Sequence, residues 1–468
     1  MKKLLLINFF LCAIALASFG QHSQSMYYME RLPQVTSMNP AFQPVSNFYL
    51  GLPGISNINL NVGNNTLDYQ DIIFDSQQVG SKITFLHPDY DIDKFLGKLN
   101  ENNDLFTEFS TNLFNVGVRA EESYFSFKIK MKADLQMSYP NDLAEIILKG
   151  NNDFKGKTAE FGNFSILSSN YLEYSLGYSQ KISDEFTFGI NVKYLNGLGL
   201  LRSKDFNLGL YTSEAGDSLA LSSDIALQAS APVKVNRDSL DYVEDIESRD
   251  IKVSDLTANP GFAIDFGATY KPMDELLLSA SVIDLGFINY GNFAHNYNIK
   301  GDYSFTGLDV SNEFGDNEDS ETLSEIEDSL KEEVKMSYSE QSFMHFLGPK
   351  IYIGGRYYFN DRVDLGLLSR TQFYNGRVHQ SFTLSANTRP IRGISLTASY
   401  SILNNSYNNL GLGLILRLGP FQFYTISDTF SAGLWPHKTK SFNLRFGLNF
   451  AFGNNPIGRI LNNEPMIR

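Results

Sequence analysis

The sequence predicts an all-β protein, a transmembrane antiparallel β-barrel of about 14–16 strands with an N-terminal plug segment and a few short helices in its loops. Three observations predict this fold: a secretory leader, a single cysteine inside that leader, and recurring runs of alternating apolar and polar residues. Each run is about ten residues long, the length of a tilted membrane strand. No later apolar run is long enough for a membrane helix, so a chain that spans a membrane must close into a barrel.

The first residues have the three parts of a signal peptide. Lys2 and Lys3 give a basic start, residues 4–17 an apolar core, and Ser18-Phe19-Gly20 a small-x-small cleavage site. We therefore predict that residues 1–20 are removed before Gln21 and that the mature chain is secreted.

Composition excludes several classes of protein. The only cysteine, Cys12, lies inside the leader, so disulfides and cysteine metal ligands are not expected in the mature chain. Lys and Arg number 38 against 52 Asp and Glu, a balance that argues against nucleic acid and anionic lipid head groups as partners. The 37 Phe and 25 Tyr are typical of an outer-membrane barrel, although a secreted β-sandwich could share this composition.

The strand pattern is clearest in "SFNLRFGLNFAF", residues 441–452, where Phe and Leu alternate with Asn, Arg, Gly and Ala. Similar runs occupy 125–132, 171–178, 262–270, 394–401 and 410–419. Their weaker faces carry Gly, Ser, Asn and isolated charges, which suit a barrel lumen better than the solvated face of a soluble sheet. The pattern thus favours lipid over a sandwich core behind the apolar face.

Connections between the runs predict the topology. Five are short: 182–185, 271–275, 359–362, 388–393 and 417–420. If all five are periplasmic, the long connections near 236–258, 306–346 and 428–440 fall together on the outside, as in bacterial barrels. We assign the barrel to residues 55–453, with acidic insertions at 236–258 and 306–346 and a C-terminal tail at 454–468.

Three stretches have helical spacing. Residues 315–335 place Leu323, Ile326 and Leu330 among many carboxylates and predict a solvated amphipathic helix over the barrel mouth. Calcium or partner binding is the sharper alternative, but the glycine and final glutamate of a helix-loop-helix calcium site are missing. Residues 91–103 and 139–150 predict two more helices, periplasmic or in the lumen.

Residues 21–54 precede the first convincing strand. Pro33, Pro40, Pro44 and Pro53 keep this stretch irregular, and Asn39-Pro40 favours a turn. Irregular backbone at membrane depth requires a protein-filled or wet cavity. We therefore predict a plug segment inside the barrel, with Asn39, Pro40 and Ala41 as its candidate residues.

Catalytic motifs are not recognisable in the sequence. The six histidines lack zinc-site spacing, and no nucleophile elbow, Walker loop or dinucleotide fingerprint occurs. We expect no enzyme, cofactor or metal, although folding could still join a Ser-His pair. Charges on the predicted inner faces either pack the lumen as ion pairs or line a solute path: Glu173, Asp265, Arg356, Arg417 and Arg445.

Several phrases resemble a known family. "SMNPAFQP", "NPGFAIDFGATYKP" with "LSASVIDLGFINY", and "GPKIYIGGRYYF" are similar to a Bacteroidota family of outer-membrane β-barrels known only as a domain of unknown function, over about residues 25–453. The Asn-Pro-Ala triplet more distantly resembles the plug of long-chain fatty-acid transporter barrels and of the type IX secretion shuttle barrel. The resemblance implies the fold, and carries no activity or site residue with it.

The strand at 441–452 also resembles the signal read by barrel-assembly machinery, with Arg445, Gly447, Phe450 and Phe452 at the matching positions. The tail after it departs from barrels that end on the aromatic residue, and this leaves open whether 441–452 is the final strand.

The sequence therefore predicts a protein of the Gram-negative cell outer membrane. Our first hypothesis is passage or binding of a hydrophobic or small solute through a partly plugged lumen. The alternative is a non-transporting scaffold or accessory barrel of a secretion or cell-surface complex, and a barrel-embedded hydrolase comes third. The partners expected are outer-membrane lipid, the barrel-assembly machinery, and a small hydrophobic solute or an envelope protein.

Overall fold

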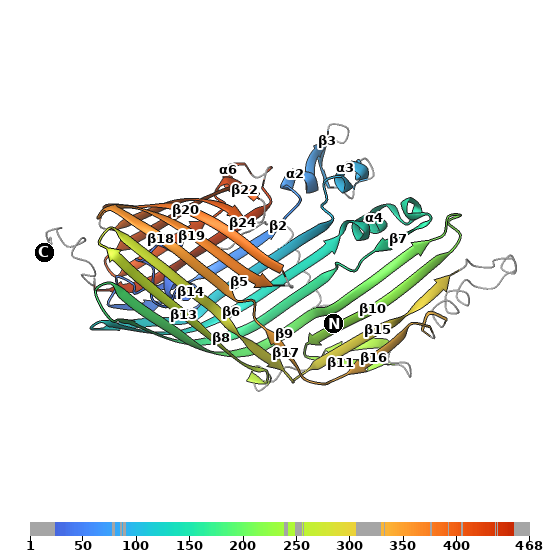
Figure 1. Cartoon of the computed structure of the whole chain (residues 1–468), viewed down its shortest axis with the longest axis horizontal. Coiled ribbons are helices and arrows are strands. Elements are labelled where there is room, and N and C mark those ends of the chain that lie inside the picture. The colour runs from blue at the N-terminus through green and yellow to red at the C-terminus, as the bar shows by residue number, and fades with distance from the viewer. Residues whose placement is uncertain are drawn as a thin grey trace.

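The chain forms a closed antiparallel β-barrel with 14 strand positions, which confirms the predicted fold class (Figure 1). This computed structural model describes residues 24–76, 80–84, 87, 90–237, 242–248, 255, 257–305, 329–331, 333–374, 377–391, 393–403, 406–435, 437 and 439–453. The predicted leader, residues 238–241, 249–254 and 256 of the first acidic insertion, residues 306–328 and 332 of the second, and the tail 454–468 lie outside the described residues. Most of the helix predicted at 315–335 falls in this part.

The strands follow one another around the wall almost in chain order. They are β1 (Phe48–Gly51) and β2 (Ile58–Asn64), which share one position, and then β5 (Asn102–Ala120), β6 (Ser123–Pro140), β8 (Ser165–Lys181), β9 (Phe186–Thr212), β13 (Pro260–Met273), β14 (Leu276–Tyr290), β18 (Lys350–Asn360), β19 (Val363–Tyr374), β20 (Arg377–Ile391), β21 (Ile394–Leu403), β22 (Ser406–Leu418), β23 (Phe421–Ser427) and β24 (Ser441–Phe452).

The ring closes where the first and last strands meet. On one side β24 pairs with β1 (Phe48 with Phe452) and with β2 (Ile58 with Phe446), while β5 pairs with both from the other side. The wall therefore begins at Phe48 and not at residue 55. Four residues of β1 are too short a run to reveal a strand by alternation after a proline-rich stretch.

All five short connections lie at one end of the barrel, which we call the short-turn end. The strand pairings next to these turns place them at the same level: Phe186 of β9 pairs with Tyr270 of β13, and Val363 of β19 pairs with Thr388 of β20. The opposite end, the long-connection end, bears the helices α2 (Tyr69–Ile72), α3 (Ile92–Leu96), α4 (Asn141–Lys149) and α6 (Ser431–Leu434) (Figure 1).

Two helices were thus placed at the wrong end by the sequence pattern. The structure has β2 antiparallel to β5 and β5 antiparallel to β6, so β2 and β6 both run from the short-turn end toward the long-connection end. Consequently α3 and α4 follow outgoing strands and lie at the long-connection end, with the pairing of Asn102 and Pro140 at their bases.

Several strands extend the wall on one side only. After pairing with β13, β9 continues and pairs with β10 (Leu219–Ser230), which pairs in turn with β15 (Ala294–Phe305) and that with β16 (Lys335–Ser339). The smaller elements of the long-connection end are β3 (Ile73–Ser76), β4 (Ser81–Thr84), β7 (Lys157–Glu160), β11 (Val233–Arg237), β12 (Val243–Ser248), β17 (Phe343–Phe346) and η2 (Asn152–Phe154).

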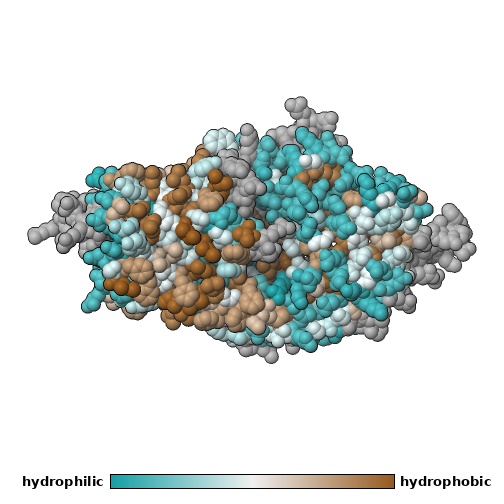
Figure 2. Space-filling model, in the orientation of Figure 1, coloured by the Kyte–Doolittle hydropathy of each residue, from teal (hydrophilic) through white to brown (hydrophobic). Residues whose placement is uncertain are grey.

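The outer surface has two regions. Exposed apolar side chains gather on the half of the molecule nearer the short-turn end, whereas the other half is mostly hydrophilic (Figure 2). On single strands the exposed residues alternate with buried polar ones, as in β20, where Phe382 and Leu384 are about half exposed and Thr383 and Ser385 are buried. No helix in the described part of the chain is long and apolar enough to cross a membrane.

Residues 24–47, the inner segment, fill part of the ring. They contain a short 3₁₀ turn, η1 (Pro33–Ser37), and otherwise irregular backbone. Their apolar side chains form one cluster with inward-facing wall residues: Met26, Tyr27, Tyr28, Met29, Leu32, Val35, Met38 and Phe42 pack with Ile283, Tyr352, Leu368, Ile415, Tyr424 and Ile426. The barrel therefore has a solid core near its short-turn half.

Candidate functional site

The Asn39-Pro40-Ala41 turn is packed against the inner wall. Asn39 is fully buried; its Oδ1 accepts a hydrogen bond from the Ala41 amide at 2.9 Å, and its Nδ2 donates to the Ala280 carbonyl at 3.3 Å. Together these bonds fix the turn internally and fasten it to β14. The three residues predicted to belong to a plug are thus inside the ring of strands.

Inward-facing glycines make room for the inner segment. A methyl group on Gly189 of β9 would overlap the Pro40 carbonyl, and one on Gly267 of β13 would overlap Asn39. Gly354 and Gly366 leave space for Tyr28 in the same way. Because a glycine brings its backbone closest to a neighbour, these positions set how near the inner segment lies to the wall.

Two predicted lumen residues, Glu173 of β8 and Asp265 of β13, belong to one buried group of charges. We define the inner charge cluster as Lys128, Lys130 and Lys132 of β6, Glu173, Lys193 of β9, Asp265, Asp284 of β14 and Lys350 of β18. Alternation along β6, β8, β9 and β13 turns the residues that these strands contribute into the ring. All members of the cluster except Lys128 come within ion-pair distance of an opposite charge on another strand, and Lys128 instead donates to the hydroxyls of Thr36 and Ser37.

Asp284 is the hub of the cluster. Its carboxylate lies 2.7 Å from Lys193 Nζ, 3.3 Å from Lys132 Nζ and 3.5 Å from Lys350 Nζ. Asp284 has a φ of 61°, in the left-handed region, and its amide donates to Asp265 Oδ1 at 2.8 Å. This bulge in β14 directs the carboxylate toward three lysines, and strained backbone of this kind is found where a side chain must be aimed.

Arg356, the third predicted lumen residue, connects the wall to the inner segment in a separate group. Its Nε and Nη2 each lie 2.8 Å from the Asp364 carboxylate, and its Nη1 lies 2.5 Å from Oε1 of Glu30. Arg389 also reaches Asp364, at 2.6 Å. Arg356 and Asp364 are both buried, so the pair holds Glu30 and the inner segment in place.

The remaining two candidates lie apart. Arg417 is at the rim of the short-turn end, where its guanidinium donates to the Ala451 carbonyl at 2.9 Å. Arg445 donates to Asn59 Oδ1 at 3.2 Å, close to the inner segment residue Met26. The five predicted residues therefore form no single site.

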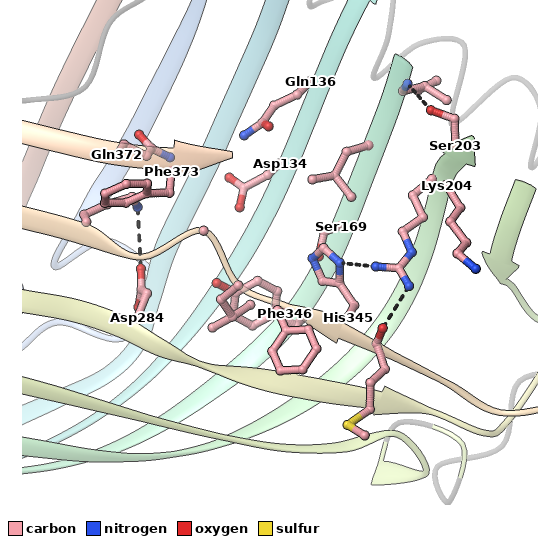
Figure 3. Close-up of a pocket in the computed structure, with 18 residues that line it drawn as sticks. Asp134, Gln136, Ser169, Ser203, Lys204, Asp284, His345, Phe346, Gln372 and Phe373 are labelled. Carbon is pink, nitrogen blue, oxygen red and sulfur yellow. Dashed lines mark hydrogen bonds and ion pairs between the residues drawn. The ribbon is translucent and has the colours of Figure 1, made fainter. Parts of the chain in front are cut away.

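A cavity of about 490 Å³ lies inside the ring at the level of Asp284, the hub of the inner charge cluster (Figure 3). Asp284 and Lys350 belong both to the cluster and to the cavity wall. We call this cavity the lumen pocket; β6, β8, β9, β14, β17, β18 and β19 all contribute to it, so it spans a large part of the ring.

The lumen pocket is lined by both charged and apolar side chains. Arg202 of β9 donates to the Met344 carbonyl at 2.8 Å and lies 3.3 Å from His345 Nδ1, which joins β9 to β17 across the pocket (Figure 3). Asp134 faces the same space from β6. Apolar and aromatic side chains complete the lining: Ile166, Leu167, Tyr171, Phe346, Leu347 and Phe373.

The closing strand has the two faces that its sequence indicates. Asn443 and Asn449 are buried on the inner side, and Phe452 is 46% exposed on the outer side. Gly447 faces inward, where a side chain would overlap the Ser56 carbonyl. Phe450 packs on Phe421 with ring centroids 4.9 Å apart. A role for Gly447, Phe450 and Phe452 in assembly stays a prediction.

Sequence reasoning missed most of the cluster. The alternation in 125–132 placed Lys128, Lys130 and Lys132 on one face, and this was the available signal for an inner basic stripe. Asp284 gave no signal, because its direction depends on the bulge. Among the described residues no three His, Cys, Asp or Glu side chains are arranged to hold a metal ion.

The sequence matches the profile of a protein family described as "Family of unknown function (DUF5723)" over residues 40–428, more than half of the chain. The chain belongs to this family. Membership confirms the resemblance to a domain of unknown function, and the family description names no activity. No curated protein sequence matches the chain significantly.

Solved structures with a similar chain course include transporters and other barrels. A FadL homologue of Pseudomonas aeruginosa has 13% identity and a TM-score of 0.43 over 93% of this chain and all of that one. The toluene transporter TbuX of Ralstonia pickettii has 10% identity and a TM-score of 0.39 over 89% and 93% of the two chains. TodX of Pseudomonas putida, also a toluene transporter, has 8% identity and a TM-score of 0.37 over 92% and 93%. At these values the likeness assigns no solute to this chain.

Proposed function

We propose that this chain is an integral barrel of the outer membrane that takes a small or hydrophobic solute into the lumen pocket and passes it through a partly filled lumen. The membrane location is supported by the exposed apolar side chains near the short-turn end (Figure 2), which water would not favour on a soluble barrel. Bacterial barrels keep short turns at the periplasm. The long-connection end would then face outward.

The lumen pocket is the observation that carries the proposed transport. Its volume of about 490 Å³ lies in the range of small-molecule sites, and its lining combines aromatic surface with a few polar groups. Next to it lie the inner charge cluster and the inner segment, which leave little open lumen. A solute would therefore be held in the pocket before it passes the inner segment.

Filling the pocket tests this function. Ser169 is buried at the pocket wall, and its neighbour Ser168 lies on the opposite face of β8. In proteoliposomes, the unaltered protein is expected to give swelling in arabinose and to bind 1-naphthol in equilibrium dialysis. Ser169→Trp should reduce both several-fold, whereas the matched Ser168→Trp should change neither. Absence of both flux and binding in the unaltered protein would contradict the proposal.

A scaffold role is the second candidate, and the one-sided extension of the wall favours it. Strands β9, β10, β15 and β16 continue past the apolar region and offer a large, mostly hydrophilic surface (Figures 1 and 2). Shortening the β9–β10 hairpin beyond Asp205 and Ala226 should abolish co-purification of a partner and leave flux unchanged if this role holds. Loss of flux with intact co-purification would argue against it.

A further inference from the structure

One side of the lumen pocket, on β6, carries hydrogen-bond acceptors that lack donors. Asp134 and Gln136 lie two positions apart on this strand, so both face into the ring, and both line the pocket. The carboxylate of Asp134 makes no hydrogen bond or ion pair with the described residues. The Oε1 atom of Gln136 is buried, also without a partner in the described part of the chain. This acceptor side therefore suits a donor supplied by a solute.

The surroundings of Asp134 favour a positively charged donor. Glu108 of β5 is paired directly with Asp134, and like charges opposite each other destabilise a sheet. The cations near Asp134 are Lys132 and Lys350. Both ammonium groups contact Asp284 instead, at 3.3 and 3.5 Å. A further cation at Asp134 would relieve its repulsion from Glu108, and an ammonium group supplies both the charge and the donors.

The other side of the pocket, on β9, has cations without acids. Arg202 contacts the Gln228 side chain, the Met344 carbonyl and the His345 ring, and no carboxylate in the described part of the chain. These four hydrogen bonds leave one N–H of its Nη1 for a solute. Lys204 adds positive charge at the same edge of the pocket. A carboxylate is the group that a guanidinium binds best.

The acceptor and donor sides are two strands apart. Gln136 pairs with Leu167 of β8, and Leu167 pairs with Arg202, so the three residues form one row across the inner face. Neighbouring strands are about 4.8 Å apart, which separates the backbones at the two ends of the row by roughly 10 Å. Figure 3 shows Asp134 on one side of the pocket and Lys204 on the other. The floor between them is Leu167 and small Ser169.

From this arrangement we infer that the lumen pocket takes zwitterionic solutes whose ammonium and carboxylate are held apart by a short, partly apolar body, as in a tripeptide. Asp134 binds the ammonium and Arg202 the carboxylate, while Leu167 and Tyr171 contact the body. An extended chain spans at most about 3.3–3.6 Å per residue, so three residues match the spacing of the two sides. The inference rests on the proposed function, because it names the class of solute that the same pocket holds.

Blocked peptides test each end of the solute separately. The probes are trialanine, N-acetyl-trialanine, which lacks the ammonium, and trialanine amide, which lacks the carboxylate. Equilibrium dialysis at neutral pH measures their binding to the unaltered full chain in detergent micelles. Trialanine should bind about tenfold or more tightly than either blocked form, because each charged end makes a charge-assisted hydrogen bond. Equal or weaker binding of trialanine would overturn the inference without any variant.

Two substitutions assign the ends to their residues. Asp134→Asn should remove the preference for the free ammonium and keep that for the free carboxylate, whereas Arg202→Gln should do the reverse. The matched controls Asp184→Asn and Lys181→Gln change an ion pair on a surface turn and should alter neither preference. Unaltered heat-modifiable mobility verifies that each variant is folded. If both preferences survive in both pocket variants, the assignment to Asp134 and Arg202 is wrong.

Failure of this inference and failure of the proposed function give different results. Arabinose swelling and 1-naphthol binding without selective binding of trialanine would overturn the zwitterionic solute and leave transport intact. Absence of swelling and of binding by every probe would refute transport itself. Ser169→Trp, which fills the floor between the two sides, should abolish trialanine binding, and unchanged binding in this variant would place the peptide outside the pocket.

Discussion

At the residue scale, the barrel depends on glycines that face inward. Gly189 lies directly against the carbonyl of Pro40, so even one added methyl group displaces the Asn39-Pro40-Ala41 turn or the strand. Strands usually lose packing at glycine, but here the missing side chain is replaced by the backbone of the inner segment. The glycines on the weaker strand faces thus have a packing reason that alternation alone does not reveal.

Gly189→Ala is expected to loosen the inner segment and to cost about 1–3 kcal/mol of unfolding free energy through overpacking. Urea midpoints in detergent micelles measure the cost, and trypsin cleavage at Arg31 in the folded barrel reports on the segment. Gly355→Ala is the control, since its new Cβ would lie 3.6 Å from Leu278 Cδ2, an ordinary contact. Equal trypsin resistance in both variants would show that the inner segment does not depend on this contact.

Asp364→Asn should lower the free energy of unfolding strongly, although the two side chains are almost the same size. Two arginines, Arg356 and Arg389, share this buried carboxylate, and removing one partner of a buried ion pair costs about 3–5 kcal/mol. The unfolding midpoint measures the loss. Asp184→Asn removes an exposed carboxylate from a surface pair and should change the unfolding free energy by less than about 1 kcal/mol. Similar losses in the two variants would rule out a special role for the Arg356 group.

At the element scale, β9 tests where the membrane lies. Val192 and Tyr211 are each 40% exposed on this strand, but Val192 is paired with β13 and Tyr211 with β10 at the far end of the hairpin. Val192→Arg should cost about 2–4 kcal/mol in a lipid environment, whereas Tyr211→Arg should cost little. Refolding into lipid vesicles measures both. Equal costs for the two variants would show that the lipid boundary does not lie between Val192 and Tyr211, where the apolar region of Figure 2 ends.

The closing strand β24 allows a role in recognition by the assembly machinery to be distinguished from a role in the stability of the barrel. If Phe452 is read during assembly, Phe452→Ala should lower the amount of heat-modifiable barrel in cells several-fold while refolding from urea into detergent stays near that of the unaltered protein. Phe430→Ala, at a residue of similar exposure beyond β23, should affect neither. A parallel loss in cells and in detergent would mean that Phe452 matters for packing on Phe48 only.

At the scale of the whole molecule, an outer-membrane barrel should fractionate with the outer membrane and run faster on gels before boiling than after it. The difference in gel mobility is expected because the backbone hydrogen bonds of a closed sheet persist in detergent until the sample is heated. Recovery of the folded protein from the soluble fraction without detergent would contradict the membrane assignment.

The fold class and the strand faces could be predicted from the sequence because the alternation of apolar and polar residues is a local signal. Runs such as 441–452 predicted strands with correct faces, and short turns predicted that one end would hold all five. The interior was harder, because ion pairs join residues that only folding brings together. Lys132 could be placed on an inward face, but its partners Glu173 and Asp284 come from other strands. The direction of the Asp284 side chain depends on the left-handed backbone conformation of Asp284 itself. Likewise the pairing of Glu30 with Arg356 required the course of the inner segment.

The position of the inner segment next to the barrel seam has a consequence for the order of folding. The hydrogen bonds from Ser25 to Asp428 connect residues 403 positions apart, and β1, which directly follows the inner segment, finds β24 only when the chain is nearly complete. Contacts this distant in sequence form late. The first part of the chain to be synthesised must therefore wait for the last, so that sealing the wall and seating the inner segment become a single final step.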